Sequence, residues 1–449
     1  MHRRKLAGKW RAGNSRHMRN PFLRGGEDID FTSFSSGHKK TVNRWVFEFL
    51  MTYLFALHSK TLKHDDIEII FLHSINNTGD ITLRNPNIEY QNSNGLAVLE
   101  EEYLLAKVKF LGETYFVNLS TRREELEGIL HSIITKGVSP NSSKAVDLED
   151  ILIKESIRNS IYKGKILKVL EAPYQRDDED SINLKINIVD DLNKSDLSKV
   201  FLPNGTRKEM GKFIECVSRF SDINMNLRYL LSGLPGTGKT HLIRAVAKEC
   251  ENKATIILAS GGDSRLNTLF SFANIFSPAI LCIDDIDLIV GNRDTRSHDS
   301  SLGTLLQKLD GFIESGVFVL ATTNDKKMVD IAASRPGRFD QIIDMGKLES
   351  KNYLALVESL TKDDEIRKLF GNIAVLSMLK KKNIVGAFLA TLVKQAIITK
   401  KTNGKKGFSK SELLTMIKQY HTGFYQNPNE AFAGFYQNSD EGLDNFDEN

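Results

Sequence analysis

The chain has 449 residues, of which 41% are hydrophobic and 26% are charged. These values are ordinary for globular proteins, so a wholly disordered or fibrous chain is excluded, and the length predicts two or three domains. Three scattered cysteines argue against a disulfide framework or a structural zinc site, which favours a reducing, cytoplasmic setting. The longest apolar run, residues 45–57, is too short to span a bilayer, for which about twenty residues are needed.

Charge is distributed unevenly along the chain, although the net charge is only +4. Residues 1–24 contain basic side chains and no acidic one, whereas residues 428–449 contain acidic side chains and no basic one. A basic start is typical of a nucleic-acid-binding arm, a contact for an acidic partner, an organellar transit peptide or a solvated tail. Residues 1–40 are therefore predicted to be a basic flexible arm, and both nucleic acid binding and organellar import stay open.

Residues 41–138 are predicted to form a small α/β domain. Large apolar side chains recur every four residues in the segment 42–57, as on one face of a helix. Runs rich in β-forming residues follow at 67–72, 106–110 and 114–119. Turn-forming residues then cluster near residue 140, so the segment 139–198 is predicted to be a linker with accessory strands at 161–170 and 182–189.

The pattern changes in the segment 199–347, where short apolar strands alternate with helical stretches. This alternation is typical of a parallel sheet with crossover helices. The five predicted strands are 229–232, 255–259, 279–284, 317–322 and 341–344. The segment 348–420 is predicted to be a small helical domain, with helices at 351–360, 364–380, 385–400 and 409–420.

Residues 421–449 contain a near-repeat, in which GFYQNPNE at 423–430 returns as GFYQNSDE at 434–441. Two copies that combine aromatic and acidic residues are typical of a docking tail, and a solvated tail without a partner is the alternative.

The segment GLPGTGKT at 233–240 matches the pattern GxxxxGK[ST] and lies between a predicted strand and a predicted helix. In that setting backbone N–H groups converge on phosphate oxygens at a helix N-terminus, whose dipole favours an anion. Lys239 is expected to reach the β- and γ-phosphates, and Thr240 to place its hydroxyl on Mg²⁺. The residues expected to bind the phosphates are Gly233, Pro235, Gly236, Thr237, Gly238, Lys239, Thr240 and His241.

Two later strands end in polar residues that suit the same chemistry. The strand 279–284 ends in Asp284, and Asp285 follows. One acid at such a strand end holds Mg²⁺ and a second orients and deprotonates the attacking water, so we assign Asp284 to the metal and Asp285 to the water. After the strand 317–322, the amide of Asn324 is expected to hydrogen-bond the γ-phosphate or the water, although a lone Asn at a strand end is also a common turn former.

With these elements in order, residues 199–399 resemble the AAA+ ATPases, in the AAA branch that carries the second region of homology. The resemblance rests on five strings: GLPGTGKT at 233–240, IDDID at 283–287, LLQKLDGF at 305–312, ATTN at 321–324 and RPGRFD at 335–340. It implies an α/β fold: a P-loop domain with a five-stranded parallel sheet and a helical lid, preceded here by a separate α/β amino-terminal region. It further implies ATP and Mg²⁺ as cofactors and an ATPase that assembles into a ring, expected to be a hexamer.

The resemblance also assigns residues outside the phosphate site. In proteins that look like this, two arginines of the RPGRFD motif reach the neighbouring subunit's nucleotide, a role that falls here on Arg335 and Arg338. The alternative is that one of the pair forms a structural salt bridge. Gly386 and Ala387 are similar to a pair that lies against the nucleotide base and ribose.

Three features depart from the family pattern. The second acid is usually Glu, and Asp285 is one methylene shorter. An acid usually follows the Gly-Ala pair, whereas this chain has Phe388. The aromatic loop of protein-threading members is replaced by SGGDS at 260–264. The string 263–271 is more similar to the mitochondrial translocase of the Rieske iron–sulfur protein, as is VFLP at 200–203, although no membrane span is predicted here.

Three classes of function follow from these observations. The first is an ATP-driven machine that remodels a protein or an assembly, with residues before 199 supplying partner contacts. The second is nucleic-acid handling, such as helicase loading, for which the basic arm is the motive. The third is a scaffold that binds ATP, assembles and hardly hydrolyses it, for which Asp285 is the motive.

Overall fold

The chain divides into two compact units, Met1–Lys163 and Gly164–Asn449. A computed structural model describes the following residues: 38–77, 81–84, 88–91, 97–99, 103–121, 127–134, 143–170, 185–189, 192, 196–260, 266–288, 316–325, 338–403 and 407–426. Residues 1–37 of the predicted basic arm, and the predicted tail beyond residue 426, lie outside these residues, whereas residues 38–40 of the predicted arm begin a strand, β1 His38–Asn43.

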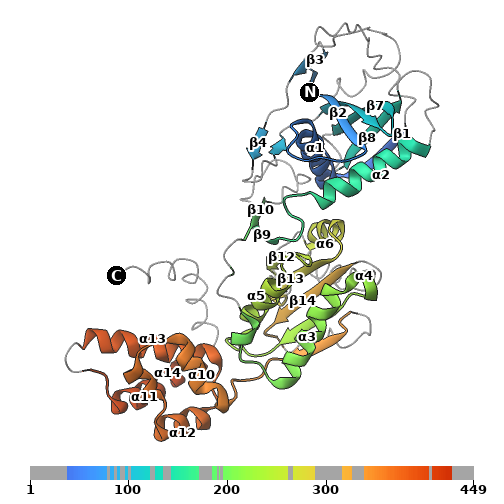
Figure 1. Ribbon diagram of the computed structural model, residues 1–449. Helices are drawn as coiled ribbons and strands as arrows, with labels where there is room; N and C mark the ends of the chain where they lie inside the picture. Colours follow the sequence, from blue (N-terminus) through green and yellow to red (C-terminus); the bar gives the residue numbers. More distant parts are fainter. Residues whose placement is uncertain are drawn as a thin grey trace, which may run out of the picture. The chain divides into compact units, whose positions relative to one another are not determined.

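The first unit is an antiparallel sheet with two helices packed on it (Figure 1). The sheet order is β1-β8-β7-β6-β2-β3, and β4 pairs with β5. Helix α1 begins where the side chain of Asn43 accepts a hydrogen bond from the Trp45 N–H, and its buried Phe47, Leu50 and Leu54 belong to the core. The elements are β1 His38–Asn43, α1 Arg44–His58, β2 Ile67–Asn77, β3 Ile81–Arg84, β4 Ile88–Gln91, β5 Ala97–Leu99, β6 Tyr103–Phe110, β7 Glu113–Thr121, β8 Glu127–Ile134 and α2 Ser143–Arg158.

Helix α2 lies within the segment predicted to be a linker. Its buried residues Ala145, Leu148 and Leu152 are spaced by three and four positions, which is the pattern of one helix face. The segment was predicted to be a linker because turn-forming residues cluster just before this helix. The hairpin between β6 and β7 turns through Leu111 and Gly112, both at positive φ, as a two-residue turn requires.

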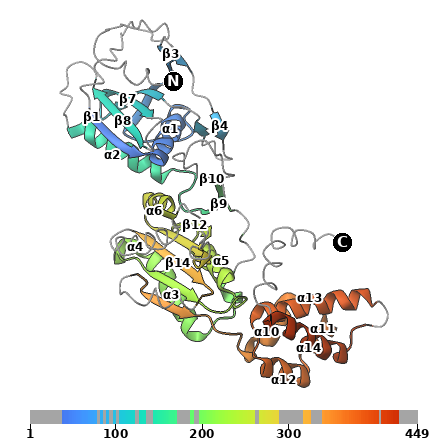
Figure 2. The same ribbon diagram turned by 180° about the vertical axis from the view of Figure 1, so that it is seen from behind.

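The second unit contains a seven-stranded sheet with the order β10-β9-β12-β13-β14-β11-β15. Four of its strands, β9, β10, β12 and β14, are labelled in Figure 2. The five strands predicted from the sequence are confirmed as its parallel part. Strand β9 extends this part by pairing parallel to β12, and β10 pairs antiparallel to β9. The segment predicted as linker and accessory strands is therefore divided: α2 belongs to the first unit, whereas β9 and β10 widen the sheet of the second.

Helices α3 and α5 share one apolar core with the sheet. Met210 and Phe213 of α3, Leu242 and Val246 of α5, and Leu320 of β14 are all buried in the same cluster. Helix α6 packs against β12, β13 and β14. The elements are β9 Ile166–Leu170, β10 Lys185–Ile188, η2 Leu197–Lys199, α3 Asn204–Ser218, α4 Phe220–Ile223, β11 Arg228–Ser232, α5 Lys239–Cys250, β12 Thr255–Ser260, α6 Leu266–Ile275, β13 Ala279–Asp284, β14 Val317–Thr323 and β15 Gln341–Asp344.

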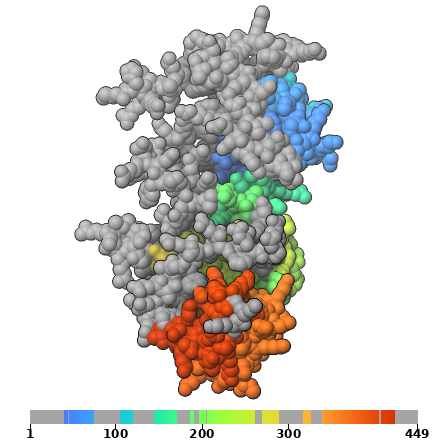
Figure 3. Space-filling view, turned by 90° about the vertical axis from the view of Figure 1, so that its left-hand side faces the viewer, coloured from blue at the N-terminus to red at the C-terminus, as the bar shows by residue number. Residues whose placement is uncertain are grey.

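The helical lid follows the sheet, and its atoms form one continuous orange and red body in Figure 3. Its core includes Phe370, Phe388 and Leu392. The single helix predicted at 364–380 is two helices, because Asn372 caps a new one by accepting a hydrogen bond from the Ala374 N–H. The elements are η3 Ser350–Asn352, α10 Tyr353–Leu360, α11 Asp364–Phe370, α12 Ile373–Lys382, α13 Gly386–Thr402 and α14 Lys410–Gln426. Among the helices that the structure describes, none is both long and apolar enough to cross a bilayer.

Candidate functional site

The candidate site lies where three adjacent parallel strands end. Strand β14 pairs with β11 on one side and with β13 on the other. Their carboxyl ends therefore meet at one edge of the sheet, which is where ligands bind in open α/β sheets. The residues that follow these ends are the phosphate loop, the carboxylates after β13 and Asn324.

The phosphate loop has a backbone that only glycine adopts without strain at several positions. Gly233, Gly236 and Gly238 have φ values of 151°, 78° and 96°. A Cβ added to Gly233 would lie 3.2 Å from Thr237 Oγ1 and 3.3 Å from Met345 Cβ, so this position also lacks space for a side chain. Pro235 completes the loop, and His241 lies on the exposed side of the first turn of α5.

Lys239 opens helix α5 and is only 5% exposed. Its ammonium group donates to the carbonyl oxygens of Gly233 and Leu234, at 2.8 and 3.1 Å, and to Asn324 Oδ1 at 2.6 Å. Burial lowers the pKa of Lys239, and the surrounding carboxylates, led by Asp285, oppose that shift. The lysine is therefore held inside the loop, at the amino end of the helix.

The hydroxyl of Thr240 donates to Asp284 Oδ2 at 2.8 Å, which joins the loop to the end of β13. The other oxygen of this carboxylate, Oδ1, accepts a hydrogen bond from Thr322 Oγ1 at 2.5 Å. Thr322 Oγ1 in turn accepts from the backbone N–H of Asp285 at 2.8 Å. The two residues assigned to the metal are thus in contact, and a buried threonine of β14 holds both acids.

Asp285 stands in the left-handed backbone region, with φ of 53°. Its Oδ1 accepts a hydrogen bond from Asn324 Nδ2 at 2.8 Å. Burial, followed by the charges of Asp284 and Asp287, raises the pKa of Asp285 to about 6. A carboxyl group with a raised pKa is suited to accept a proton near neutral pH.

The lid reaches the phosphate loop through the predicted Gly-Ala pair. The N–H of Ala387 donates to the carbonyl of Gly236 at 3.1 Å, and a Cβ on Gly386 would lie 3.8 Å from the same oxygen. Phe388, where the family pattern has an acid, is 1% exposed within the lid core. Its side chain therefore serves the packing of the lid.

The two predicted arginines have different outcomes. Arg335 lies outside the described residues, as does the string 305–312. Arg338 is described and is 8% exposed in the single chain. Next to it, Asp340 accepts a hydrogen bond from the backbone N–H of Arg228 at 2.7 Å, and the N–H of Asp340 donates to the Arg228 carbonyl at 2.8 Å.

The residues present fit a magnesium triphosphate. The amino end of α5 and its glycine-rich loop suit phosphate oxygens. Thr240 and Asp284 offer the hard oxygen ligands that Mg²⁺ takes, and it usually needs only one or two carboxylates because phosphates and water fill the other positions. Four carboxylates raise the pKa of Lys239: those of Asp284, Asp285, Asp287 and Asp344. Negative charge therefore exceeds positive charge around this lysine, which suits a divalent cation.

A family model described as "ATPase family associated with various cellular activities (AAA)" matches residues 229–347. The chain contains an AAA ATPase domain. The cofactors of such a domain are ATP and Mg²⁺, in agreement with the prediction from the sequence.

Curated relatives of the AAA ATPase domain include ATP-dependent zinc metalloproteases named FtsH. The FtsH of Sulfurovum sp. (strain NBC37-1) is 32% identical over 237 residues, which are 48% of this chain and 35% of that protein. FtsH 3 of Sorangium cellulosum (strain So ce56) is 44% identical over 130 residues, which are 25% of this chain and 21% of that protein. FTSH 7 of Arabidopsis thaliana, a chloroplastic protein, is 32% identical over 216 residues, which are 43% of this chain and 26% of that protein. The chain spans about a third or less of the length of these relatives.

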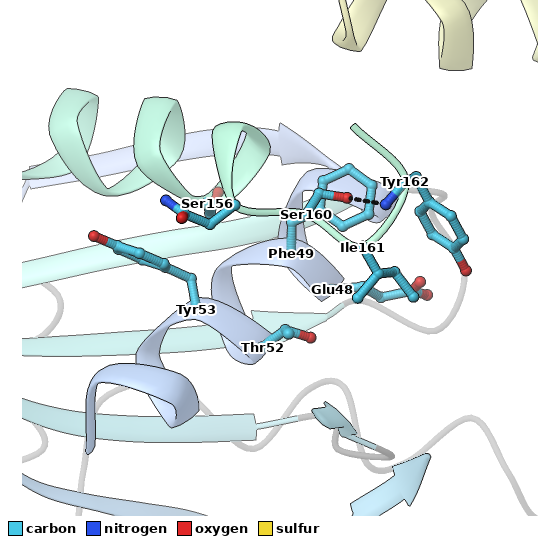
Figure 4. A pocket seen from close by; sticks show the side chains of 9 residues that line it. Glu48, Phe49, Thr52, Tyr53, Ser156, Ser160, Ile161 and Tyr162 are labelled. Atoms are coloured by element: carbon cyan, nitrogen blue, oxygen red, sulfur yellow. Dashed lines mark hydrogen bonds between the residues drawn. The ribbon is translucent and has the colours of Figure 1, made fainter. Parts of the chain in front are cut away.

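A pocket in the first unit is lined by none of these residues (Figure 4). Glu48, Thr52 and Tyr53 of α1 line it together with Ser156 of α2 and the turn that follows α2, including Tyr162. Burial, and then the charge of Glu155, raises the pKa of Tyr53 to about 12. The pocket encloses about 30 Å³, which is room for water and not for a nucleotide.

Proposed function

We propose that the chain hydrolyses ATP with Mg²⁺ in a ring of identical copies, expected to be a hexamer, and uses the cycle to remodel a protein or a protein assembly. One observation carries the proposal: Lys239, Asn324 and Asp285 form a continuous hydrogen-bonded chain, beside the contact between Thr240 and Asp284. The groups proposed to bind the phosphates and the magnesium and to orient the attacking water thus lie at one edge of the sheet.

Each side chain has a distinct role in the proposed reaction. Lys239 would donate to the β- and γ-phosphate oxygens in place of its loop acceptors, and Thr240 and Asp284 would hold the magnesium. When bound, the cation would neutralise charge that develops on the phosphates. Asp285 orients the attacking water and accepts its proton, and Asn324 holds Asp285 in register with the γ-phosphate.

Arg335 and Arg338 are proposed to act on the nucleotide of the neighbouring copy, where a guanidinium stabilises negative charge during transfer. Because Arg338 is 8% exposed in a single copy, its side chain has to turn outward when copies assemble. The HExxH pattern of zinc proteases does not occur among the 449 residues, so the proposal is confined to the ATPase and does not include proteolysis.

Phosphate release tests the proposal directly. We expect Lys239→Ala to abolish nucleotide binding, and Asp285→Asn to bind ATP without releasing phosphate. Mixing Lys239→Ala subunits with Arg338→Ala subunits should restore part of the ATP hydrolysis, because some subunit interfaces then combine an intact phosphate loop with an intact Arg338. A mixture as inactive as its components would contradict sites shared between copies.

A scaffold that binds ATP and hardly hydrolyses it is the second candidate. It is favoured by the short side chain of Asp285, which is already bonded to Asn324. The scaffold is excluded if the unsubstituted protein releases phosphate from ATP and the Lys239→Ala variant does not. Cross-linking of partners to the Asp285→Asn variant would then distinguish a protein partner from a nucleic acid.

A further inference from the structure

A third carboxylate, Asp287, lies just beyond the two assigned acids and faces the end of β14. Its Oδ1 accepts a hydrogen bond from the backbone N–H of Asn324 at 3.1 Å and another from Thr323 Oγ1 at 3.0 Å. Thr323 is fully buried, and Asp287 and Asn324 are partly buried. One oxygen of Asp287 therefore binds two consecutive residues at the point where the strand ends.

The position of this contact matters because Asn324 is the first residue past β14. Its backbone is no longer part of the strand, so another partner has to hold it. The side chain of Asn324 meanwhile accepts from Lys239 Nζ at 2.6 Å and donates to Asp285 Oδ1 at 2.8 Å. The backbone of Asn324 is thus held by Asp287, and its side-chain amide bridges the ammonium group of Lys239 and the carboxylate of Asp285.

We propose that Asp287 is a positioning residue, which fixes Asn324 between Lys239 and Asp285 and thereby sets the geometry for hydrolysis. The proposal rests on the ATPase activity proposed above. A displacement of about 1 Å at a catalytic group is enough to lower a rate by about 100-fold, so a hydrogen bond behind the site is able to control turnover.

Two substitutions separate this role from a general loss of structure. Asp287→Ala removes the acceptor, whereas Asp287→Asn retains an oxygen at the same place and removes only the charge. We expect Asp287→Ala to lower kcat by about 10-fold or more while KM changes by less than about 3-fold, since Asn324 acts after binding. We expect Asp287→Asn to keep kcat within about 3-fold of the unsubstituted protein.

Asp363 supplies a matched control in the lid. Its carboxylate accepts two backbone hydrogen bonds, from Glu365 and Ile366, at 3.0 and 3.2 Å, and forms an ion pair with Lys400. Asp363→Ala therefore loses at least as many contacts as Asp287→Ala, but in the lid and away from the strand end. We expect it to lower the melting temperature and to leave kcat unchanged at 25 °C.

Amide hydrogen exchange in the nucleotide-free protein gives a second readout that does not depend on turnover. The Asn324 amide should exchange at least about 10-fold faster in Asp287→Ala, and close to the original rate in Asp287→Asn, because only the first variant loses the acceptor.

The outcomes divide cleanly. A low kcat and fast exchange in Asp287→Ala, with recovery of both in Asp287→Asn, support the positioning role. The proposal is overturned if Asp287→Asn is as impaired as Asp287→Ala, or if Asp287→Ala leaves kcat and exchange unchanged. If ATP hydrolysis is absent, or is unaffected by Lys239→Ala, the proposed function is refuted. In that case the contact between Asp287 and Asn324 is still tested by hydrogen exchange, and an unchanged exchange rate of the Asn324 amide in Asp287→Ala would refute it.

Discussion

Thr322 is the residue whose replacement tests the architecture of the site most directly. It is fully buried, and its single hydroxyl donates to Asp284 Oδ1 at 2.5 Å while accepting from the Asp285 N–H at 2.8 Å. Thr322→Val keeps the shape of the side chain and removes both hydrogen bonds. We expect the substitution to destabilise the second unit and to reduce phosphate release.

The magnitude follows from the two bonds that are lost. A hydrogen bond to a charged acceptor contributes about 1.5–3 kcal/mol, and an N–H left without that partner costs about 1 kcal/mol or more. Together they lower the free energy of unfolding by about 3 kcal/mol, which corresponds to a fall in melting temperature of roughly 6–12 °C for a domain of this size.

Thr322→Ser is the matched control, because it retains the hydroxyl and removes only a methyl group. We expect it to cost about 1 kcal/mol, the usual effect of one buried methyl. Guanidinium unfolding followed by circular dichroism, without nucleotide, measures both variants. If Thr322→Val were as stable as the original chain, or more stable than Thr322→Ser, the hydroxyl would not hold the two acids.

Three further predictions concern other parts of the second unit. In the folded chain Asp285 keeps its proton up to about pH 6, above its ordinary pKa of 3.8, so the native state binds more protons and loses stability as pH rises through this window. Asp285→Asn, which stays neutral, should therefore be about 1–2 kcal/mol more stable than the original chain at pH 8, after allowance for solvent screening, and equal to it at pH 4 in thermal unfolding. Gly233→Ala should weaken binding of a fluorescent ATP analogue by about 10-fold or more, because of its φ of 151° and the crowded Cβ position, whereas Gly211→Ala in α3 has open space and should bind normally. Asp363→Ala should destabilise the lid by about 1 kcal/mol through loss of the α11 cap, and unchanged hydrogen exchange in α11 would contradict this.

The parallel sheet was predictable from the sequence because its central strands are buried on both faces and appear as short apolar runs. The edge strands were harder to assign. Strand β9 precedes β11, the first of the five predicted strands, by a long stretch of chain, and only its pairing with β12 shows that it belongs to the sheet. The predicted helix at 364–380 is divided at Asn372 by a single capping hydrogen bond, and the periodicity of apolar residues does not reveal such a cap.

The candidate site shows the same limit at the level of single residues. Lys239 and Thr240 were expected in the phosphate loop, and Asp284 and Asn324 at strand ends. The structure brings all four together, and their catalytic roles stay predictions. Asp287 was not singled out, although it stands in the same string of acids. The direction of the Asp287 side chain depends on the left-handed backbone of Asp285. A string of alternating acidic and apolar residues does not indicate that conformation.

The contacts of Lys239 set how nucleotide affinity should be understood. This ammonium donates to three oxygen acceptors in the structure, two of them in its own loop. Binding is therefore an exchange of partners, and the measured affinity is the difference between new contacts and those given up. A substitution that weakens these three hydrogen bonds without touching phosphate is able to tighten binding, so gain-of-affinity variants should be sought around Lys239 as well as among the residues that contact the nucleotide.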